Sequence, residues 1–245
     1  MAIELPGELV WVINLIGVNW PQVNEDKVRE FAGHVREFGR SVDATHQAAG
    51  ETIRQLGEHY QADSYEQLVA AWGMRSDSHM SELVQACEFT AAALEIAADG
   101  IVAMKLAVIT ELGIMAAEFV ADQAAAVATL GAAEAAEALL IEATKKVVNG
   151  LIQTAEQELI GALINEAVGP LEQTVERALA GLAFKGVEAA LGTPGDGAGA
   201  GGPGQGFRIH PEEMMRHAQL LHGHAEEVQG HGARFAAVAS GVSFS

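Results

Sequence analysis

An apolar stripe with nearly heptad spacing, between residues 24 and 60, constrains the fold of this chain more than any other feature. Asn24 is a favourable N-cap and Glu25 follows it in the first turn, so a helix start is expected here. We therefore predict one long helix over residues 24–59. Its apolar members lie three, four or seven residues apart, as on one helix face: Val28, Phe31, Val35, Phe38, Val42, Ala49, Ile53, Leu56 and Tyr60.

A second striped helix follows a short break at residues 60–63. Ser64 and Gln67 form a capping box, in which each side chain satisfies a free backbone amide. The stripe continues through Leu68, Trp72, Met80, Leu83, Cys87, Leu94 and Ile101. Two striped helices joined by a short turn bury both stripes by folding back on each other. We therefore predict an antiparallel hairpin that buries these side chains at its seam or against later helices: Phe31, Phe38, Leu83 and Trp72.

The pattern remains helical from residue 100 to residue 191. Hydrophobic residues make up 49% of the chain but aromatic residues only 5%, so the apolar share is mostly alanine and aliphatic side chains, which favour helices. We expect two or three further helices, with breaks near Gly131, near Asn149-Gly150 and at Gly169-Pro170. The predicted fold class is all-α, an elongated bundle of long helices that forms one domain over residues 1–192.

One more helix is expected after a glycine-rich segment. Residues 193–206 have the composition of a flexible linker, and residues 207–245 form a single amphipathic helix that opens at Pro211. We expect this helix to be tethered rather than fixed to the main domain. Its seam has the 4-3 spacing of a coiled coil: Met214, Ala218, Leu221, Ala225, Val228, Gly232, Phe235 and Ala239.

Histidine is the one reactive residue type that this last helix holds in numbers. His210, His217, His224 and His231 are seven residues apart, which is two helical turns and too far for joint metal chelation. We expect His217, His224 and His231 to flank the seam. They are either a polar flank or a pH-sensitive contact, because imidazole titrates just below neutrality. The sequence leaves the direction of that pH effect open.

The charge balance and the motif content exclude several functions. The chain has 33 acidic and 14 basic residues, a net charge of −19, whereas nucleic-acid binding requires a basic patch. Cys87 is the sole cysteine and lies on the second stripe, so we expect a core residue rather than a nucleophile. Motifs for phosphate loops, hydrolases and metal-dependent proteases are absent. We predict no enzyme activity, no cofactor, no metal and no small-molecule substrate.

An apolar run at residues 9–20 is the one N-terminal feature with a targeting or membrane character. Glu4 and Glu8 precede it where a cleavable signal peptide carries basic residues, and it is too short to span a bilayer. It is either a strap packed on the helices behind it or a segment that binds an interface or a partner. Further along the chain, charges recur too often for a membrane-spanning helix.

The hairpin resembles the WXG family of type VII secretion, small helical hairpins whose turn carries Trp-x-Gly. Here the turn is Tyr60-Gln61-Ala62, with Tyr60 in place of Trp and Ala62 in place of Gly, and Trp72 matches a second aromatic position of the family. The resemblance implies a helical hairpin that pairs with small WXG-type helical proteins or associates with itself.

Longer stretches are similar to the helical N-terminal domain of actinobacterial toxins exported by type VII secretion, the outer membrane channel protein CpnT-like family. These stretches are residues 3–9, Asn19-Trp20-Pro21, residues 23–26 and residues 122–126, and the resemblance covers residues 1–192. It implies a non-enzymatic targeting and interaction module of a secreted toxin or toxin-related protein, secreted or associated with the cell surface or outer membrane. A membrane-active or pore-forming channel component is the alternative.

Overall fold

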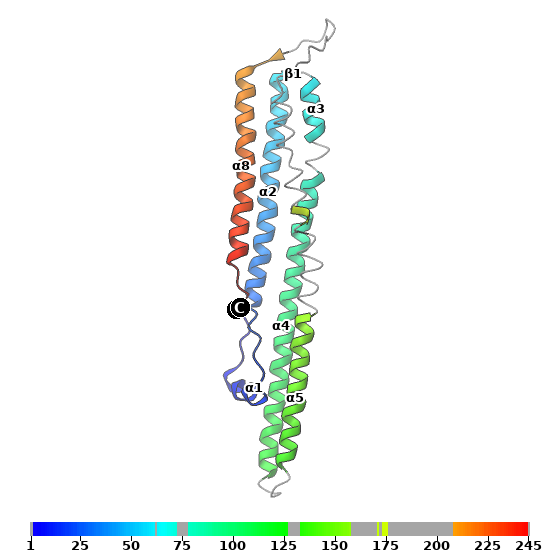
Figure 1. Cartoon of the computed structure of the whole chain (residues 1–245), viewed down its shortest axis with the longest axis vertical. Coiled ribbons are helices and arrows are strands. Elements are labelled where there is room, and N and C mark those ends of the chain that lie inside the picture. Colours follow the sequence, from blue (N-terminus) through cyan, green and yellow to red (C-terminus); the bar gives the residue numbers. More distant parts are fainter. Residues whose placement is uncertain are drawn as a thin grey trace. The chain divides into compact units, whose positions relative to one another are not determined.

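The computed structural model describes residues 2–61, 63–72, 78–126, 133–157, 171, 173–175 and 208–244. Within them the chain is built from long helices (Figure 1), as the predicted all-α class requires. The helical elements are η1 (Gly7–Leu9), α1 (Val10–Ile16), α2 (Glu25–His59), α3 (Asp63–Trp72), α4 (Ser78–Ala126), α5 (Ala133–Ala155) and α8 (Pro211–Gly241).

Two short strands depart from the purely helical expectation. β1 (Tyr60–Gln61) and β2 (Arg208–Ile209) pair antiparallel, with Tyr60 opposite Ile209 and Gln61 opposite Arg208. A strand of two residues leaves no alternating pattern in a sequence, so periodicity does not reveal it.

The contacts divide the chain into two compact units. Unit 1 contains Met1–Ala32, Ala92–Ala167 and Val242–Ser245, and unit 2 contains Gly33–Ala91 and Val168–Gly241. Helices α2 and α4 contribute residues to both units. The predicted linker at residues 193–206 lies outside the described residues, as do the predicted breaks at Gly131 and at Gly169-Pro170.

Helix α2 begins and ends close to where the sequence predicts. The Oδ1 atom of Asn24 accepts hydrogen bonds from the backbone N–H groups of Asp26 at 3.0 Å and Lys27 at 3.1 Å, which is the expected N-cap. The predicted second helix is described as α3 and α4, and residues 73–77 between them lie outside the described part.

The predicted break at Asn149-Gly150 is wrong, because α5 continues through both residues to Ala155. Thr144 and Val148 of the same helix are buried one turn apart, just before this pair. Burial of a helix face stabilises the helix by more than the roughly 1 kcal/mol that a glycine costs in its interior.

In unit 1 the N-terminal segment packs on the long helices. Val12, Ile13 and Ile16 of α1 are buried, α1 contacts α5, and the ring of Trp11 lies 5.4 Å from that of Phe119 in α4. The other face of α1 is partly exposed at Val10, Trp11 and Leu15. One face of the apolar run is therefore a packed strap, the first of the two alternatives from the sequence.

A buried ion pair fixes the start of this segment. Glu25 is 1% exposed and Lys105 is 3% exposed, and the Nζ atom of Lys105 donates to Oε2 of Glu25 at 2.8 Å. Lys105 also donates to the backbone oxygen of Ile3 at 3.1 Å, and the Ile3 N–H donates to Oε1 of Glu25. Burial acts to raise the pKa of Glu25, but the hydrogen bonds from Lys105 and the backbone, with the charge of Lys105, lower it.

In unit 2, α8 runs beside the part of α2 that belongs to this unit (Figure 1). The β1–β2 pair joins the end of α2 to the start of α8, so the two helices are antiparallel. Two glycines of α2 allow close approach of neighbouring helices. A Cβ at Gly39 would lie 2.9 Å from Cβ of Cys87 in α4, and one at Gly57 would overlap the ring of Tyr65 in α3.

Candidate functional site

Helix α8 covers one face of α2 in unit 2. Ala49 and Ile53 of α2 form a buried apolar cluster with Leu221 of α8. Three partly buried side chains of α3 pack against this cluster: Tyr65, Leu68 and Trp72. Helices α2, α3 and α8 therefore share one apolar contact.

The residues predicted for the seam of the last helix occupy different environments. Leu221 and Val228 are buried, whereas Met214 is half-buried. The half-buried ring of Phe235 stacks on that of Phe38 in α2, with centroids 4.7 Å apart and ring planes at 22°. The structure thus brings Phe38 and Phe235 together at one end of the α2–α8 contact.

The predicted position of the histidines on the flank of the seam is wrong. Nε2 of His224 lies 3.3 Å from Oγ1 of Thr52, and Nε2 of His231 lies 3.1 Å from Oγ1 of Thr45. His217 is 0% exposed, and its ring centroid is 5.9 Å from that of His59. The three histidines therefore face α2, where their partners are also seven residues apart.

Sequence periodicity alone could not show whether the histidines or the residues next to them face α2. The predicted Ala218, Ala225 and Gly232 follow His217, His224 and His231 by one position each, so both sets of residues repeat every seven positions. The sequence signal that could have indicated the histidines is the pair of threonines at positions 45 and 52, which offer polar partners at the same spacing on α2.

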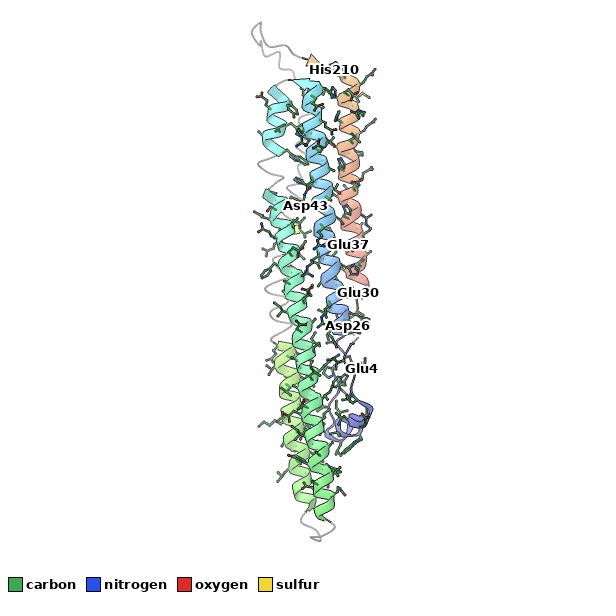
Figure 2. The ribbon with its side chains drawn as sticks, turned by 180° about the vertical axis from the view of Figure 1, so that it is seen from behind. Glu4, Asp26, Glu30, Glu37, Asp43 and His210 are labelled. Carbon is green, nitrogen blue, oxygen red and sulfur yellow. The ribbon has the colours of Figure 1, made fainter. Side chains whose placement is uncertain are left out.

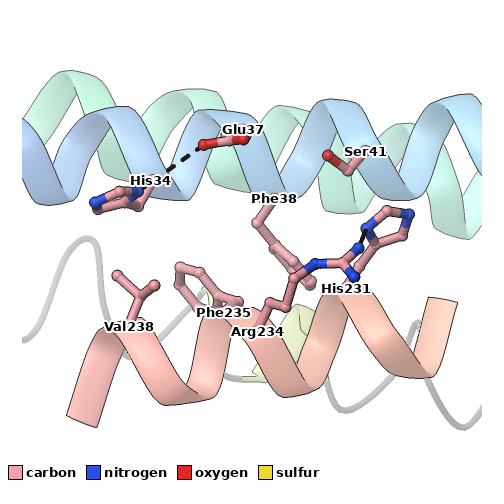
Figure 3. A pocket seen from close by; sticks show the side chains of 8 residues that line it. All are labelled: His34, Glu37, Phe38, Ser41, His231, Arg234, Phe235 and Val238. Carbon is pink, nitrogen blue, oxygen red and sulfur yellow. Dashed lines mark hydrogen bonds and ion pairs between the residues drawn. The ribbon is translucent and has the colours of Figure 1, made fainter. Parts of the chain in front are cut away.

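A pocket of about 280 Å³ lies between α2 and α8 at the Phe38–Phe235 end (Figure 3). The stacked rings form an apolar wall, and Nη2 of Arg234 lies 2.6 Å from Nδ1 of His231. On α2, Nδ1 of His34 is 3.9 Å from a carboxylate oxygen of Glu37. Ser41 and Val238 complete the lining.

The turn that resembles the WXG motif lies at the opposite end of α2. Tyr60 belongs to β1. The centroid of its ring is 6.5 Å from that of Tyr65, and the two ring planes are at 82°. Ala62 lies outside the described residues. Trp72 ends α3, where its ring stacks on that of His46 with centroids 5.1 Å apart and planes at 8°. Trp72 thereby fixes α3 on α2, in the region where the sequence predicts a buried aromatic residue.

The remaining residues predicted for the hairpin seam belong to different units. Leu83 is buried in the part of α4 that belongs to unit 2. Phe31 belongs to unit 1, where its half-buried ring makes an edge contact with Phe244, with centroids 5.9 Å apart. Cys87 is buried, and burial raises the pKa of its thiol to about 12, with a smaller contribution from the charge of Glu88. A thiol with this pKa is not a nucleophile at neutral pH.

Helix α4 has a second apolar face that points to solvent in unit 1. Ile96 is 70% exposed, Leu106 is 50% exposed and Ile114 is 48% exposed, and the exposed Ala103 and Thr110 lie between them at helical spacing. We call these five residues the outer α4 face. The exposed Asp99 lies on the same side of the helix, between Ile96 and Ala103. Large exposed aliphatic side chains gathered on one helix face are typical of surfaces that bind a partner or a membrane.

The expectation that charges exclude a membrane-spanning helix is wrong when it is judged by the length and composition of α4. Among the described residues one helix, His79–Gln123, is long and apolar enough to cross a bilayer, with a mean hydropathy of 1.8 over eighteen residues, of which 33% are buried. The reason is that Lys105 and Glu111 are the sole charged residues between Asp99 and Glu118. Core helices of soluble proteins meet the same criterion.

The described residues offer no assembled metal site. No group of three His, Cys, Asp or Glu side chains in the described ranges is arranged to hold a metal ion. Acidic side chains such as Glu30, Glu37 and Asp43 are distributed along α2 rather than gathered at one point (Figure 2). What the geometry does provide is helical contact surfaces.

Comparison with known proteins agrees with a protein built around such surfaces. Comparisons with curated proteins and with solved structures give no significant match. The family model described as the WXG100 like domain matches residues 3–147, which include the N-terminal segment, α2, the turn, α3, α4 and most of α5. This match spans more than half of the chain, and the chain therefore belongs to the WXG100-like domain family.

Proposed function

We propose that this chain is a non-enzymatic targeting and protein-interaction module of a secreted toxin or toxin-related protein that pairs with small WXG hairpin proteins. Membership of the WXG100-like family relates the chain to type VII secretion and to helical hairpins rather than to enzymes. The similarity of residues 1–192 to the CpnT-like N-terminal domain supports the toxin relationship and a location outside the cell or at its surface.

The observation that carries the pairing proposal is the outer α4 face. Ile96, Leu106 and Ile114 are each about half exposed or more, although each is a large aliphatic side chain. Burying a fully exposed side chain of this size contributes about 1.5–3 kcal/mol, so covering the part that is exposed here contributes about 1–2 kcal/mol for each of them. The spacing of three, four and seven residues suits an amphipathic helix as the partner.

Co-expression with small WXG-type hairpin proteins tests the proposal. We expect a stable complex by size-exclusion chromatography with light scattering, and we expect the double substitution Ile96→Asp/Leu106→Asp to abolish it. Leu220→Asp is the matched control, because Leu220 is a 42% exposed leucine on α8, in the other unit. Equal binding by both variants, or no binding by the unaltered chain, would contradict the proposal.

A membrane-active or pore-forming component is the second candidate, favoured by the length and hydropathy of α4. Dye release from phosphatidylcholine vesicles, with and without phosphatidylglycerol, separates the two functions. A channel component releases dye at micromolar protein, and Ile96→Asp/Leu106→Asp reduces the release. Intact vesicles together with a stable WXG complex support the interaction module alone.

A further inference from the structure

Helix α8 buries few side chains for its length. Of its 31 residues, His217, Leu221 and Val228 are buried, and one of these three is polar. The part of α2 in the same unit buries a longer apolar series: Val35, Phe38, Val42, Ala49, Ile53 and Leu56. Because the docking of a helix is stabilised mainly by the apolar area that it buries, α8 is held less firmly than α2.

Two further features weaken the contact between α8 and α2. Nε2 of His217 is buried and has no hydrogen-bond partner among the described residues, which destabilises the docked state. The pocket of about 280 Å³ lies between the two helices at the Phe38–Phe235 end, so side chains do not fill the contact there (Figure 3). Helix α8 can therefore leave α2 more easily than a fully packed core helix could.

The face of α2 beneath α8 satisfies its own threonine hydroxyls. The Thr45 hydroxyl donates to the backbone oxygen of Ser41 at 3.2 Å, and the Thr52 hydroxyl donates to that of Ala48 at 3.0 Å. Histidines of α8 contact both hydroxyls from the other side but replace neither bond. Removal of α8 therefore leaves both hydroxyl hydrogens paired.

The requirement that remains on this face is apolar cover. Ala49 and Ile53 are each 2% exposed and form a buried cluster with Leu221. The ring of Phe38 stacks on that of Phe235. Any helix that supplies an aliphatic and an aromatic side chain at these places meets the same requirement. We call the following residues the covered α2 face: Phe38, Thr45, Ala49, Thr52 and Ile53.

The helix that covers this face lies outside the part of the chain that matches the WXG100-like domain. The match spans residues 3–147, which include all of α2, whereas α8 begins at Pro211. The domain therefore contributes the covered α2 face, and a segment beyond the match supplies the helix that lies on it.

We propose that the covered α2 face is a helix-binding surface, on which α8 is an exchangeable occupant that a partner helix displaces. The partner is an amphipathic helix that runs antiparallel to α2. It carries two aliphatic side chains seven positions apart and an aromatic side chain seven positions further on, as α8 does with Leu221, Val228 and Phe235.

Helix α8 then acts as a tethered competitor of the partner. Since the partner binds only while α8 is undocked, its apparent affinity falls in proportion to the undocked fraction. The covered α2 face belongs to unit 2, whereas the outer α4 face belongs to unit 1. The proposed surface is therefore independent of the WXG pairing proposed above.

A fluorescently labelled synthetic peptide of residues 208–244 is the probe, because it carries the required pattern. Anisotropy measures its binding to the full chain and to the full-length variant Leu221→Asp/Val228→Asp, in which charges at two buried positions detach the resident α8. We expect the variant to bind the peptide at least about 10-fold more tightly, since its own helix no longer competes. Equal affinity for both chains, or no binding to the variant, would overturn the proposal.

Two controls assign the binding to the covered α2 face. Leu220→Asp changes an exposed leucine of α8, so this chain keeps its helix docked and binds the peptide as weakly as the unaltered chain does. A peptide that carries Leu221→Asp/Val228→Asp should bind neither chain. Tight binding by the Leu220 variant, or of the altered peptide, would show that the peptide binds elsewhere and would contradict the assignment.

Hydrogen exchange of the unaltered chain keeps the proposal testable if the double variant does not fold. An exchangeable α8 opens by itself, so we expect residues 211–241 to be at least about 10-fold less protected than residues 42–53 of α2, after correction for intrinsic rates. Equal protection of the two helices would show that α8 separates only when the whole unit unfolds, and would overturn the proposal.

Discussion

The two units bury polar groups in different ways. Unit 1 encloses a charged pair, Glu25 and Lys105, whose Nζ atom also donates to the backbone of Ile3. Unit 2 instead places imidazoles of α8 against threonines of α2, with His224 beside Thr52 and His231 beside Thr45. Both arrangements anchor a segment from one end of the chain on α2.

The charged pair of unit 1 predicts a response to acid. The pKa of Glu25 is lowered below its ordinary value of 4.5 in the folded state, so its contribution to stability is complete above pH 4.5. That contribution is lost as the pH falls through the lowered pKa. Acidification that stays above pH 4.5 therefore leaves the ion pair of unit 1 intact.

The largest effect is expected at the ion pair. Glu25→Gln leaves Lys105 buried without a counter-charge, which typically costs about 3–5 kcal/mol in the free energy of unfolding. Urea denaturation at pH 7.5 measures this loss. The double variant Glu25→Met/Lys105→Met is the control, because removing both charges is close to neutral. A similar loss in both variants would show that packing, and not charge, holds the N-terminal segment.

Trp72→Ala is the strongest expected change in unit 2. The ring of Trp72 stacks on His46 and packs against the cluster of Ala49, Ile53 and Leu221. Because it is partly rather than fully buried, we expect a loss of about 2–4 kcal/mol, near the lower end for aromatic truncations. Val69→Ala is the control on the same helix, since Val69 is exposed. A melting temperature within 2 °C of the unaltered chain would contradict this packing.

Gly39→Ala sharpens the comparison at the contact of α2 with α4. The new Cβ would lie 2.9 Å from Cβ of Cys87, so we expect overpacking that costs about 1–3 kcal/mol. Gly33→Ala in the same helix has open space, and alanine there is expected to stabilise by about 0.4–1 kcal/mol. Thermal unfolding of the two variants should shift in opposite directions. A shift in the same direction would mean that α4 is not close to Gly39.

The smallest effect is expected from a single threonine. Thr52→Val removes the acceptor for Nε2 of His224 while preserving shape, so we expect a loss of about 1 kcal/mol. Thr110→Val is the control, since the exposed Thr110 hydroxyl donates within its own helix to Leu106. Hydrogen exchange of α8 is the most direct measurement. Unchanged protection would show that the threonine contact does not contribute to docking.

The sequence predicts the parts of this fold that depend on local chemistry. The N-cap at Asn24, the start of the last helix at Pro211 and the aromatic position Trp72 all follow from residue type and spacing. The all-α class follows from the same patterns. Periodicity also identifies Leu221 and Val228, which are buried in α8.

The parts that sequence reasoning missed depend on residues far apart in the chain. The rotation of α8 that turns His231 toward α2 is set by Thr45, 186 positions away. The uninterrupted α5 depends on burial that no local propensity reports. The ion pair joins Glu25 to Lys105, 80 positions apart. The chain has 33 acidic residues, and nothing in the sequence around Glu25 distinguishes it from the others as the partner of Lys105.

The close approach of Gly39 to Cys87 gives this chain a built-in chemical reporter. In the folded state the thiol is buried and its pKa is raised to about 12, so alkylating reagents encounter almost no thiolate at neutral pH. Reaction therefore requires α2 and α4 to separate, and the rate of modification measures how often they do so. Because Cys87 is the sole cysteine, a single mass increment would follow the opening of the hairpin without any engineered label.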